Sequence, residues 1–260
     1  MHKKLEKPPY LIPDWKVSEL VGAAVTTREN GFSMNEFANF NLATHAGVDL
    51  CVIEKNRIEI KSWFDSGLQW QWLNQVHGNN AVRVSEAGKS IIADAAVTDQ
   101  RGLVCCVLTA DCLPVMLANK EGTEVAVAHA GWRGLQAGIL KNTIAKMTSD
   151  PNDIMAWMGP AIGPCHYEVG IEVKESFRAS AATQEELNLV ESSFAESDLE
   201  GKFYMNLYLI ARRQLLALGV SSVSGGDHCT YCEENKFYSY RRDGKTGRMA
   251  SIIFFQEEAV

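Results

Sequence analysis

Three short segments of the sequence each put a metal-ligating or nucleophilic side chain beside small residues. His77 follows an apolar run and precedes Gly78. Cys112 lies between Asp111 and a Leu-Pro pair, and His129 precedes an Ala-Gly pair. Two imidazoles and one thiol can bind Zn²⁺ or copper and leave a fourth position open. A thiol beside an imidazole is also the material of a cysteine nucleophile and its base.

Each of these residues follows or closes a run that is typical of a buried strand, so we expect them to meet at strand ends. Proline cannot donate a hydrogen bond to a sheet, so Pro114 places Cys112 at the mouth of a strand and not in its middle. We therefore predict His77, Cys112 and His129 as metal ligands and as catalytic residues. Asp111 joins the predicted catalytic set, either orienting a histidine or accepting a proton. Asp94 is a second candidate acid, with the cap of a turn as the alternative.

Cationic side chains near these segments are candidates for binding an anionic substrate. Arg133 follows the His129 corner at the expected start of a helix, where backbone N–H groups favour anions. Arg241 and Arg242 follow a predicted Tyr-Ser-Tyr strand, on which they would alternate faces, so that one of them reaches the site. Asn41 is predicted to hydrogen-bond a substrate. Trp132 is assigned to the structure, with a wall for an aromatic base as the alternative.

Two further groups of potential ligands are judged unsuitable for a metal. Cys229 and Cys232 form a C-x₂-C half-site, but the sequence offers no second pair at a suitable spacing. Cys165 and His166 are adjacent, and adjacent side chains on a strand point to opposite faces, so joint ligation is not expected.

The composition limits the possible classes of protein. The chain has 260 residues, a net charge of −7 and seven cysteines, an odd number. Cys105 and Cys106 lie in an apolar run and are interpreted as core residues, so the pattern favours a reduced, cytoplasmic chain over a disulfide framework. The acidic balance argues against nucleic-acid binding. No apolar run is long enough for a membrane span, and the first nine residues lack the apolar core of a secretory signal.

The pattern of apolar residues predicts an α+β fold with mixed sheets, because strands and helices interleave irregularly. Residues 1–18 are expected to be an N-terminal extension and residues 19–260 a single domain. The predicted strands span residues 19–28, 69–74, 81–84, 103–108, 114–118, 124–129, 154–158, 237–241 and 249–255. The predicted helices span residues 49–64, 134–147, 172–180 and 205–218, with Asp49 as an N-cap and Gly219 after the last helix. Residues 184–202 are expected to form a short helix and an exposed loop.

Several ordered motifs resemble one known family. They are FNLATHAGVD (40–49), KNR (55–57), NQVHG (74–78), ADAAVT (93–98), TADCLPV (109–115), HAGWRG (129–134), GPAIGPCHYEVG (159–170) and FYSYRRDGKTGR (237–248). Together they are similar to the YfiH, or laccase-domain, family, and the resemblance spans roughly residues 20–255.

This resemblance implies a four-layer α/β/β/α fold similar to the catalytic domain of cytotoxic necrotizing factor toxins. It also implies a Zn²⁺ or Cu²⁺ site at His77, Cys112 and His129. The family members look like cytoplasmic enzymes that phosphorolyse adenosine, inosine and methylthioadenosine and deaminate adenosine, so the expected partners are a small nucleoside and phosphate. Laccase activity and a peptidoglycan-editing role are also attached to the family.

Three kinds of chemistry therefore stay open. A metal-dependent purine nucleoside enzyme fits the three ligands and the cationic side chains, although the H-x-E…P-C-x-x-C pattern of zinc deaminases is absent. A copper-dependent polyphenol oxidase needs more copper ligands than six histidines, one of them His2 near the terminus, readily supply. A metal-free cysteine hydrolase would use Cys112 as nucleophile and His129 as base.

Overall fold

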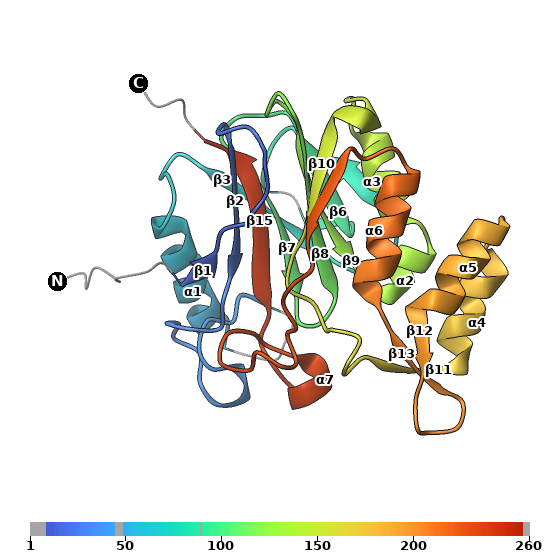
Figure 1. Cartoon of the computed structure of the whole chain (residues 1–260). Helices are drawn as coiled ribbons and strands as arrows, with labels where there is room; N and C mark the ends of the chain where they lie inside the picture. Colours follow the sequence, from blue (N-terminus) through green and yellow to red (C-terminus); the bar gives the residue numbers. More distant parts are fainter. Residues whose placement is uncertain (1–8, 45–48, 89, 257–260) are drawn as a thin grey trace.

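The computed structural model describes residues 9–44, 49–88 and 90–256. Within these residues, two six-stranded sheets lie face to face in the centre of the molecule (Figure 1). The first sheet has the order β1 (Tyr10–Leu11), β2 (Val21–Thr26), β15 (Met249–Phe255), β7 (Leu103–Thr109), β3 (Gln69–Asn74) and β5 (Ile91–Ile92).

The second sheet has the order β14 (Ser222–Gly225), β10 (Ile154–Met158), β8 (Leu113–Asn119), β9 (Val125–Ala130), β6 (Ala95–Thr98) and β4 (Ala81–Arg83). A small third sheet has the order β11 (Glu168–Gly170), β13 (Lys202–Met205) and β12 (Phe194–Glu196). Parallel pairs such as β3 with β7 and β10 with β14 stand beside antiparallel ones. The predicted α+β class with mixed sheets is confirmed.

The described residues form seven α-helices around the sheets. They are α1 (Leu50–Ser62), α2 (Trp132–Gln136), α3 (Ile139–Lys146), α4 (Ile171–Ser180), α5 (Gln184–Ser193), α6 (Leu207–Ala217) and α7 (Tyr240–Asp243), with 3₁₀ turns at Asn35–Phe37 and Pro151–Asp153. Helix α1 lies beside the first sheet, whereas α2, α3 and α6 lie beside the second (Figure 1). Among the described residues, none of the helices is both long and apolar enough to cross a bilayer.

Three apolar cores separate the helices and sheets. Ile60 of α1 packs with Trp70 and Phe254 of the first sheet. Between the sheets, β7 and β15 pack against β8 and β9, and the fully buried Cys105 lies in this core. The third core joins the outer face of the second sheet to helices α3 and α6. Burial of Cys105 and Cys106 at 0% exposure agrees with their predicted role in packing.

Local signals in the sequence explain several elements. Helix α1 begins after Asp49, whose carboxylate accepts the N–H of Cys51 at 2.9 Å, as predicted. Ile58 of that helix is 59% exposed, so it lies outside the apolar face that Ile53 and Ile60 bury. The helix predicted over 134–147 is interrupted. Gly138, with φ 85°, ends α2 and starts α3 because only glycine adopts this conformation without strain.

Two predicted segments differ in the structure. Residues 237–241 do not form a strand: Ser239 accepts the N–H of Arg242 and starts the short helix α7. Residues 184–202 contain α5 as predicted, but they also contain β12, which pairs with β13. Tyr10–Leu11, in the expected N-terminal extension, pairs with β2 in the first sheet.

A buried carboxylate fixes the end of the second sheet. Glu124 is 2% exposed, forms an ion pair with Arg83, and accepts N–H groups from Thr148 and Ser149 at 2.9 and 3.0 Å. Burial raises the pKa of Glu124, but the hydrogen bonds from Arg83, Ser149 and Thr148 outweigh it, and the pKa lies below its usual value. A carboxyl with a lowered pKa stabilises the fold above the unfolded-state pKa, and this contribution is lost as pH falls through the folded-state pKa.

We expect Glu124→Gln to lower the free energy of unfolding at pH 7 by about 1–3 kcal/mol, because a charged acceptor is lost. The deficit should begin to shrink as the pH falls below about 4.3, the ordinary pKa of an unfolded glutamate, and vanish below the lowered folded-state pKa, where wild-type Glu124 also becomes neutral. Urea unfolding across this pH range measures both effects. Glu121→Gln, at an exposed turn, is the matched control. A deficit that does not change with pH would contradict this assignment.

Candidate metal centre

The predicted ligands His77, Cys112 and His129 meet where the chain passes between the two large sheets. His77 follows β3 of the first sheet, and His129 is the fifth residue of β9 in the second. Cys112 lies in the turn between β7 and β8, which leads from one sheet to the other. The ligand atoms of the three residues lie within 4.8 Å of one another. The structure therefore brings these three side chains together, as expected from the sequence.

The ligands differ in exposure, and this defines the open side of the site. His129 is buried at 2% exposure, Cys112 is half-buried and His77 is exposed. The rings of His77 and His129 meet edge to face, with centroids 4.7 Å apart. A metal ion at this site would contact His129 and Cys112 on its buried side. Solvent or substrate would reach the ion from the side of His77.

Asp94 holds both histidines in place. One carboxylate oxygen accepts the N–H of His77 at 3.0 Å and contacts Nδ1 of His129 at 2.8 Å, and the other accepts the N–H of Gly78 at 2.7 Å. His77 has φ 59°, a left-handed conformation that these hydrogen bonds stabilise. Because a carboxylate only accepts, Nδ1 of His129 carries the proton and its Nε2 is free to bind a metal.

The charges of the site are strongly coupled. Burial raises the pKa of the Cys112 thiol, but the charge of His129 and hydrogen bonds from both imidazoles outweigh it and lower that pKa to about 6. Burial lowers the pKa of His129, but Cys112 and Asp94 raise it to about 9. Without a metal, these shifts favour a thiolate–imidazolium pair of Cys112 and His129. A metal would bind the thiolate and displace the proton from Nε2 of His129.

Close approach at the site depends on glycine. A Cβ atom on Gly131 would lie 2.9 Å from Sγ of Cys112, closer than side chains tolerate. A Cβ atom on Gly134 would meet the carbonyl oxygen of Gly78 at 3.0 Å. The small residues after His129 therefore let the start of α2 pack onto both Cys112 and the His77 turn.

Asp111 has a different set of partners from those expected of it. It is 8% exposed and has φ 88°. Its carboxylate accepts the hydroxyl of Thr230 at 2.7 Å and the N–H of Arg241 at 2.6 Å. Asp94, the other candidate acid, is the carboxylate that hydrogen-bonds the predicted ligand His129. A catalytic role of Asp111 stays a prediction.

The four predicted substrate-binding residues occupy different environments. Asn41 is fully buried, where Oδ1 accepts the N–H groups of Ala43 and Arg248 and Nδ2 has no hydrogen-bond partner among the described residues. Arg133 is exposed and lies 4.4 Å over the ring of Trp132, which packs against the third core. Arg241 donates to the carbonyl of Glu168 and lies over Tyr167 at 5.2 Å.

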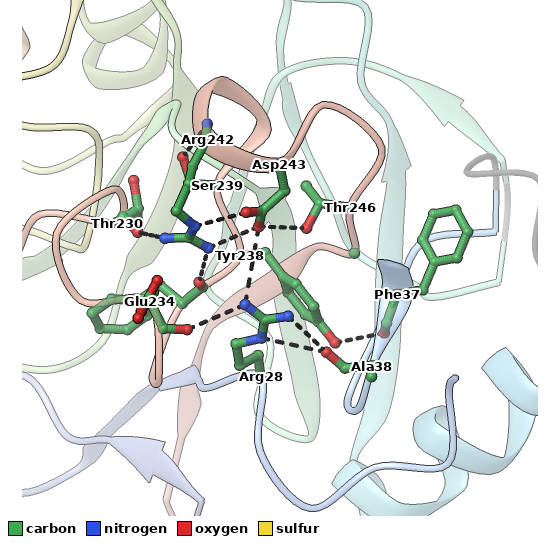
Figure 2. A network of polar contacts seen from close by, with 12 residues as sticks. Arg28, Phe37, Ala38, Thr230, Glu234, Tyr238, Ser239, Arg242, Asp243 and Thr246 are labelled. Atoms are coloured by element: carbon green, nitrogen blue, oxygen red, sulfur yellow. Dashed lines mark hydrogen bonds and ion pairs between the residues drawn. The ribbon is translucent and has the colours of Figure 1, made fainter. Parts of the chain in front are cut away.

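The guanidinium of Arg242 is committed to the structure. It donates to the carbonyl oxygens of Thr230 and Phe237 and forms two hydrogen bonds with Asp243 (Figure 2). Asp243 also pairs with Arg28 at 3.9 Å, and Arg28 donates to the carbonyl of Ala38. This network joins the loop before α7 to the segment around residue 38, so Arg242 offers no free fork to a substrate.

Two residues near the site were not singled out from the sequence. Tyr167 is half-buried and interacts electrostatically with Cys112, Arg241, Asp111 and Arg133. Burial raises its pKa, so its hydroxyl stays protonated. Arg248 is half-buried and feels the negative charges of Cys112 and Asp111, which oppose the lowering of its pKa by burial. Both residues belong to motifs quoted above, but their side chains reach the site only through folding.

A separate cavity of about 730 Å³ lies against the first sheet beside Tyr10, Trp15 and Phe254. Its lining contains no histidine or cysteine, so the candidate chemistry stays with the metal centre. Residues 45–48 of the motif at 40–49, and His2, lie outside the described residues.

The chain is similar in sequence to a known family of proteins. Residues 22–256 match the family described as multi-copper polyphenol oxidoreductase laccase. A purine nucleoside phosphorylase of Haemophilus influenzae is 42% identical over 94% of this chain and 98% of its own length. The purine nucleoside phosphorylase YfiH of Escherichia coli K12 has the same identity and coverage.

Solved structures show the same fold. The Neisseria meningitidis protein NMB0706 superposes with a TM-score of 0.90 at 41% identity and covers 96% of this chain and 100% of its own. YlmD of Geobacillus stearothermophilus superposes with a TM-score of 0.86 at 32% identity and covers 98% of each chain.

We expect Asp94→Asn to weaken metal binding about 10–100-fold, the usual effect of removing a residue that orients a ligand. The amide nitrogen would face N–H donors, so at least one of the hydrogen bonds at His77, Gly78 or His129 must be lost. Competition with a chromophoric chelator measures the affinity. Asp14→Asn, at an exposed position, is the control. An unchanged affinity in a folded Asp94→Asn protein would show that Asp94 does not position the ligands.

Proposed function

The chain belongs to the multi-copper polyphenol oxidoreductase laccase family, and on that premise we propose that it is a zinc-dependent purine nucleoside phosphorylase. It cleaves adenosine, inosine and methylthioadenosine with phosphate, and it deaminates adenosine at the same site. The observation that carries the proposal is the convergence of His77, Cys112 and His129, with ligand atoms within 4.8 Å, beside cationic side chains. The names of the relatives support the choice of nucleoside and phosphate.

The residues present fit a divalent metal. Two imidazoles and a thiol of lowered pKa form a three-ligand set with one exposed side, the pattern of a catalytic zinc site and not of a closed structural one. When bound, the ion supplies Lewis acidity, which polarises oxygen atoms of a substrate or of water. Copper is the alternative ion for the same ligands.

The chain's own residues then bind and orient the two substrates. In phosphorolysis, the bond between the sugar and the base breaks, a phosphate oxygen bonds to the sugar carbon, and the base gains a proton. Arg241, which lies over Tyr167, and Arg133, which interacts electrostatically with Tyr167, are proposed to hold phosphate, because a guanidinium fork matches its oxygen atoms. Asp111 and Asn41 stay candidates for proton transfer and for contact with the substrate.

We also propose that the sheets and helices form a four-layer α/β/β/α fold. The three successive cores support the four-layer α/β/β/α order. The similarity to cytotoxic necrotizing factor toxins, a cytoplasmic location and the division at residue 19 are parts of the proposal that rest on the sequence.

Two alternative functions use the same residues. A cysteine hydrolase, with a role in peptidoglycan editing, is favoured by the contact of the Cys112 thiol with His129. A polyphenol oxidase is favoured by the description of the family. The phosphorylase accounts better for the cationic side chains around Tyr167 and for the exposed third ligand His77.

The direct test is a product assay on adenosine. With phosphate we expect adenine and ribose 1-phosphate, and without phosphate we expect inosine and ammonia. Cys112→Ala should lose the metal and lower kcat/KM by more than the roughly 100-fold that loss of a supporting residue costs. Cys51→Ser, at an exposed cysteine, should keep both.

The alternatives predict other results in the same assay. A hydrolase would survive chelation and be inactivated at once by iodoacetamide, because its free thiolate reacts quickly. An oxidase would consume phenols and dioxygen and leave adenosine unchanged. Rapid alkylation of Cys112 in active, metal-replete enzyme would refute the proposed role of the metal.

The phosphate site is tested by arginine variants. We expect Arg241→Ala and Arg133→Ala to raise the KM for phosphate roughly 10–100-fold, the loss of one charge-assisted hydrogen bond, and to spare deamination. Arg242→Ala should instead lower the melting temperature, because its guanidinium binds protein carbonyls. Arg178→Ala on α4 is the control for charge. Unchanged phosphate dependence in both active-site variants would place the anion site elsewhere.

A further inference from the structure

A second group of potential metal ligands lies outside the site described above. It consists of Cys165, His166, Cys229 and Cys232, whose ligand atoms lie within 4.8 Å of one another. Nδ1 of His166 is 3.1 Å from Sγ of Cys165 and 3.3 Å from Sγ of Cys232. The two sulfur atoms of Cys165 and Cys232 are 3.7 Å apart. Four donors from two separate loops therefore face one point.

Folding, and not sequence spacing, creates this group. Cys165 and His166 lie in a turn before β11 and not on a strand, so their side chains are free to point the same way. The sequence prediction that they would diverge is wrong for this reason. The C-x₂-C half-site at Cys229 and Cys232 finds in them the second pair that its own neighbourhood lacks.

The loops around the cluster are built to hold the sulfur atoms. Gly163 donates its N–H to Sγ of Cys229 at 3.2 Å, and a Cβ atom on Gly163 would lie 3.2 Å from that sulfur. The ring of His166 stacks on Tyr231 with centroids 4.0 Å apart and planes 12° apart. N–H groups that point at sulfur stabilise thiolate ligands, and a stacked ring fixes the direction of an imidazole.

Backbone contacts join the same two loops beside the cluster. Ala161 pairs with Cys229 in an isolated parallel bridge, and Thr230 donates to the carbonyl of Ala161 at 3.0 Å. The hydroxyl of Tyr208, from α6, accepts the N–H of Ala161 and donates to the carbonyl of His228. The positions of the four donors are therefore fixed by contacts that do not depend on a metal.

We propose that Cys165, His166, Cys229 and Cys232 form a second metal site, which binds one Zn²⁺ ion with a structural role. Three thiolates and one imidazole are a complete tetrahedral set for zinc and leave no position open for a substrate. A disulfide is the competing use of these cysteines, but the 3.7 Å between Cys165 and Cys232 is far from the roughly 2.05 Å of a disulfide bond.

The second site supports the first through Asp111. The hydroxyl of Thr230, next to Cys229, donates to the Asp111 carboxylate at 2.7 Å. The N–H of Ile162, from the other loop, donates to the carbonyl of Asp111 at 3.0 Å. A metal that ties the two loops together therefore holds the turn that carries Cys112 from both sides.

Metal analysis of protein purified without added metal tests the proposal independently of catalysis. We expect two zinc ions per wild-type chain and one in the double variant Cys229→Ser, Cys232→Ser. Cys112→Ala should keep the second ion and lose the first, and Cys51→Ser should keep both. Two results would refute the second site. In the first, Cys112→Ala and the double variant both keep the zinc content of the wild type. In the second, the wild type binds one ion, and only Cys112→Ala removes it. If the first site binds no metal but the second site does, the wild type should contain one ion, and only the double variant should lose it.

Differential alkylation covers the case in which the double variant does not fold. In the metal-replete wild type, iodoacetamide should modify Cys51 and spare Cys165, Cys229 and Cys232. A chelator should then expose these three cysteines to modification, as peptide mass spectrometry reports. Modification of Cys229 and Cys232 at the rate of Cys51, or their recovery as a disulfide, would overturn the proposal.

Discussion

The turn between β7 and β8 is the constraint on which the candidate site depends. Here the chain leaves the first sheet at Thr109 and enters the second at Leu113, so the residues between them must cross from sheet to sheet. Asp111 makes the crossing with φ 88°, a conformation that costs a non-glycine residue about 1–3 kcal/mol. Hydrogen bonds from Thr230, Arg241 and Ile162 offset that cost. As a result, Cys112 points toward the histidines that each sheet contributes.

The buried carboxylate of Asp94 holds the two histidines of the site in place. A fully buried carboxylate is stable only when its charge is satisfied, and Asp94 has the N–H groups of residues 76–78 and the imidazole of His129 around it. Burial raises its pKa, but the hydrogen bonds from His129 and Gly78 outweigh burial and lower that pKa. One charge thereby sets the conformation of His77 and the proton position on His129. The proposed ligands are therefore positioned without a metal, a preorganisation that would favour tight and selective binding.

Much of the framework could be predicted from the sequence because it depends on local signals. The strands Gln69–Asn74 and Ile154–Met158 agree with the predicted bounds, since their apolar runs are bounded by clear turns. The cap at Asp49 and the glycine after α6 follow from short-range chemistry. The same reasoning placed His77, Cys112 and His129 at strand ends, and three similar contexts sufficed to group them.

The errors arose where the structure depends on contacts between distant segments. Arg242 looks like an anion clamp in the sequence, but its fork is taken up by carbonyls that only the folded loop presents (Figure 2). Asp94 contacts His129 besides capping the turn at residues 76–78, and Asp111 binds Thr230 instead of a histidine. These partners, His129 and Thr230, are 35 and 119 positions away in the sequence. Cys165 and His166 meet Cys229 and Cys232 across more than 60 residues. Periodicity carries no information about such meetings.

We propose that one turn brings ligands from two sheets to a single metal ion. Anomalous diffraction at the zinc absorption edge, from crystals of protein purified without added metal, tests this arrangement. We expect a peak in contact with Sγ of Cys112, Nε2 of His129 and a ring nitrogen of His77. Crystals that contain zinc elsewhere but show no peak between these three side chains would contradict it.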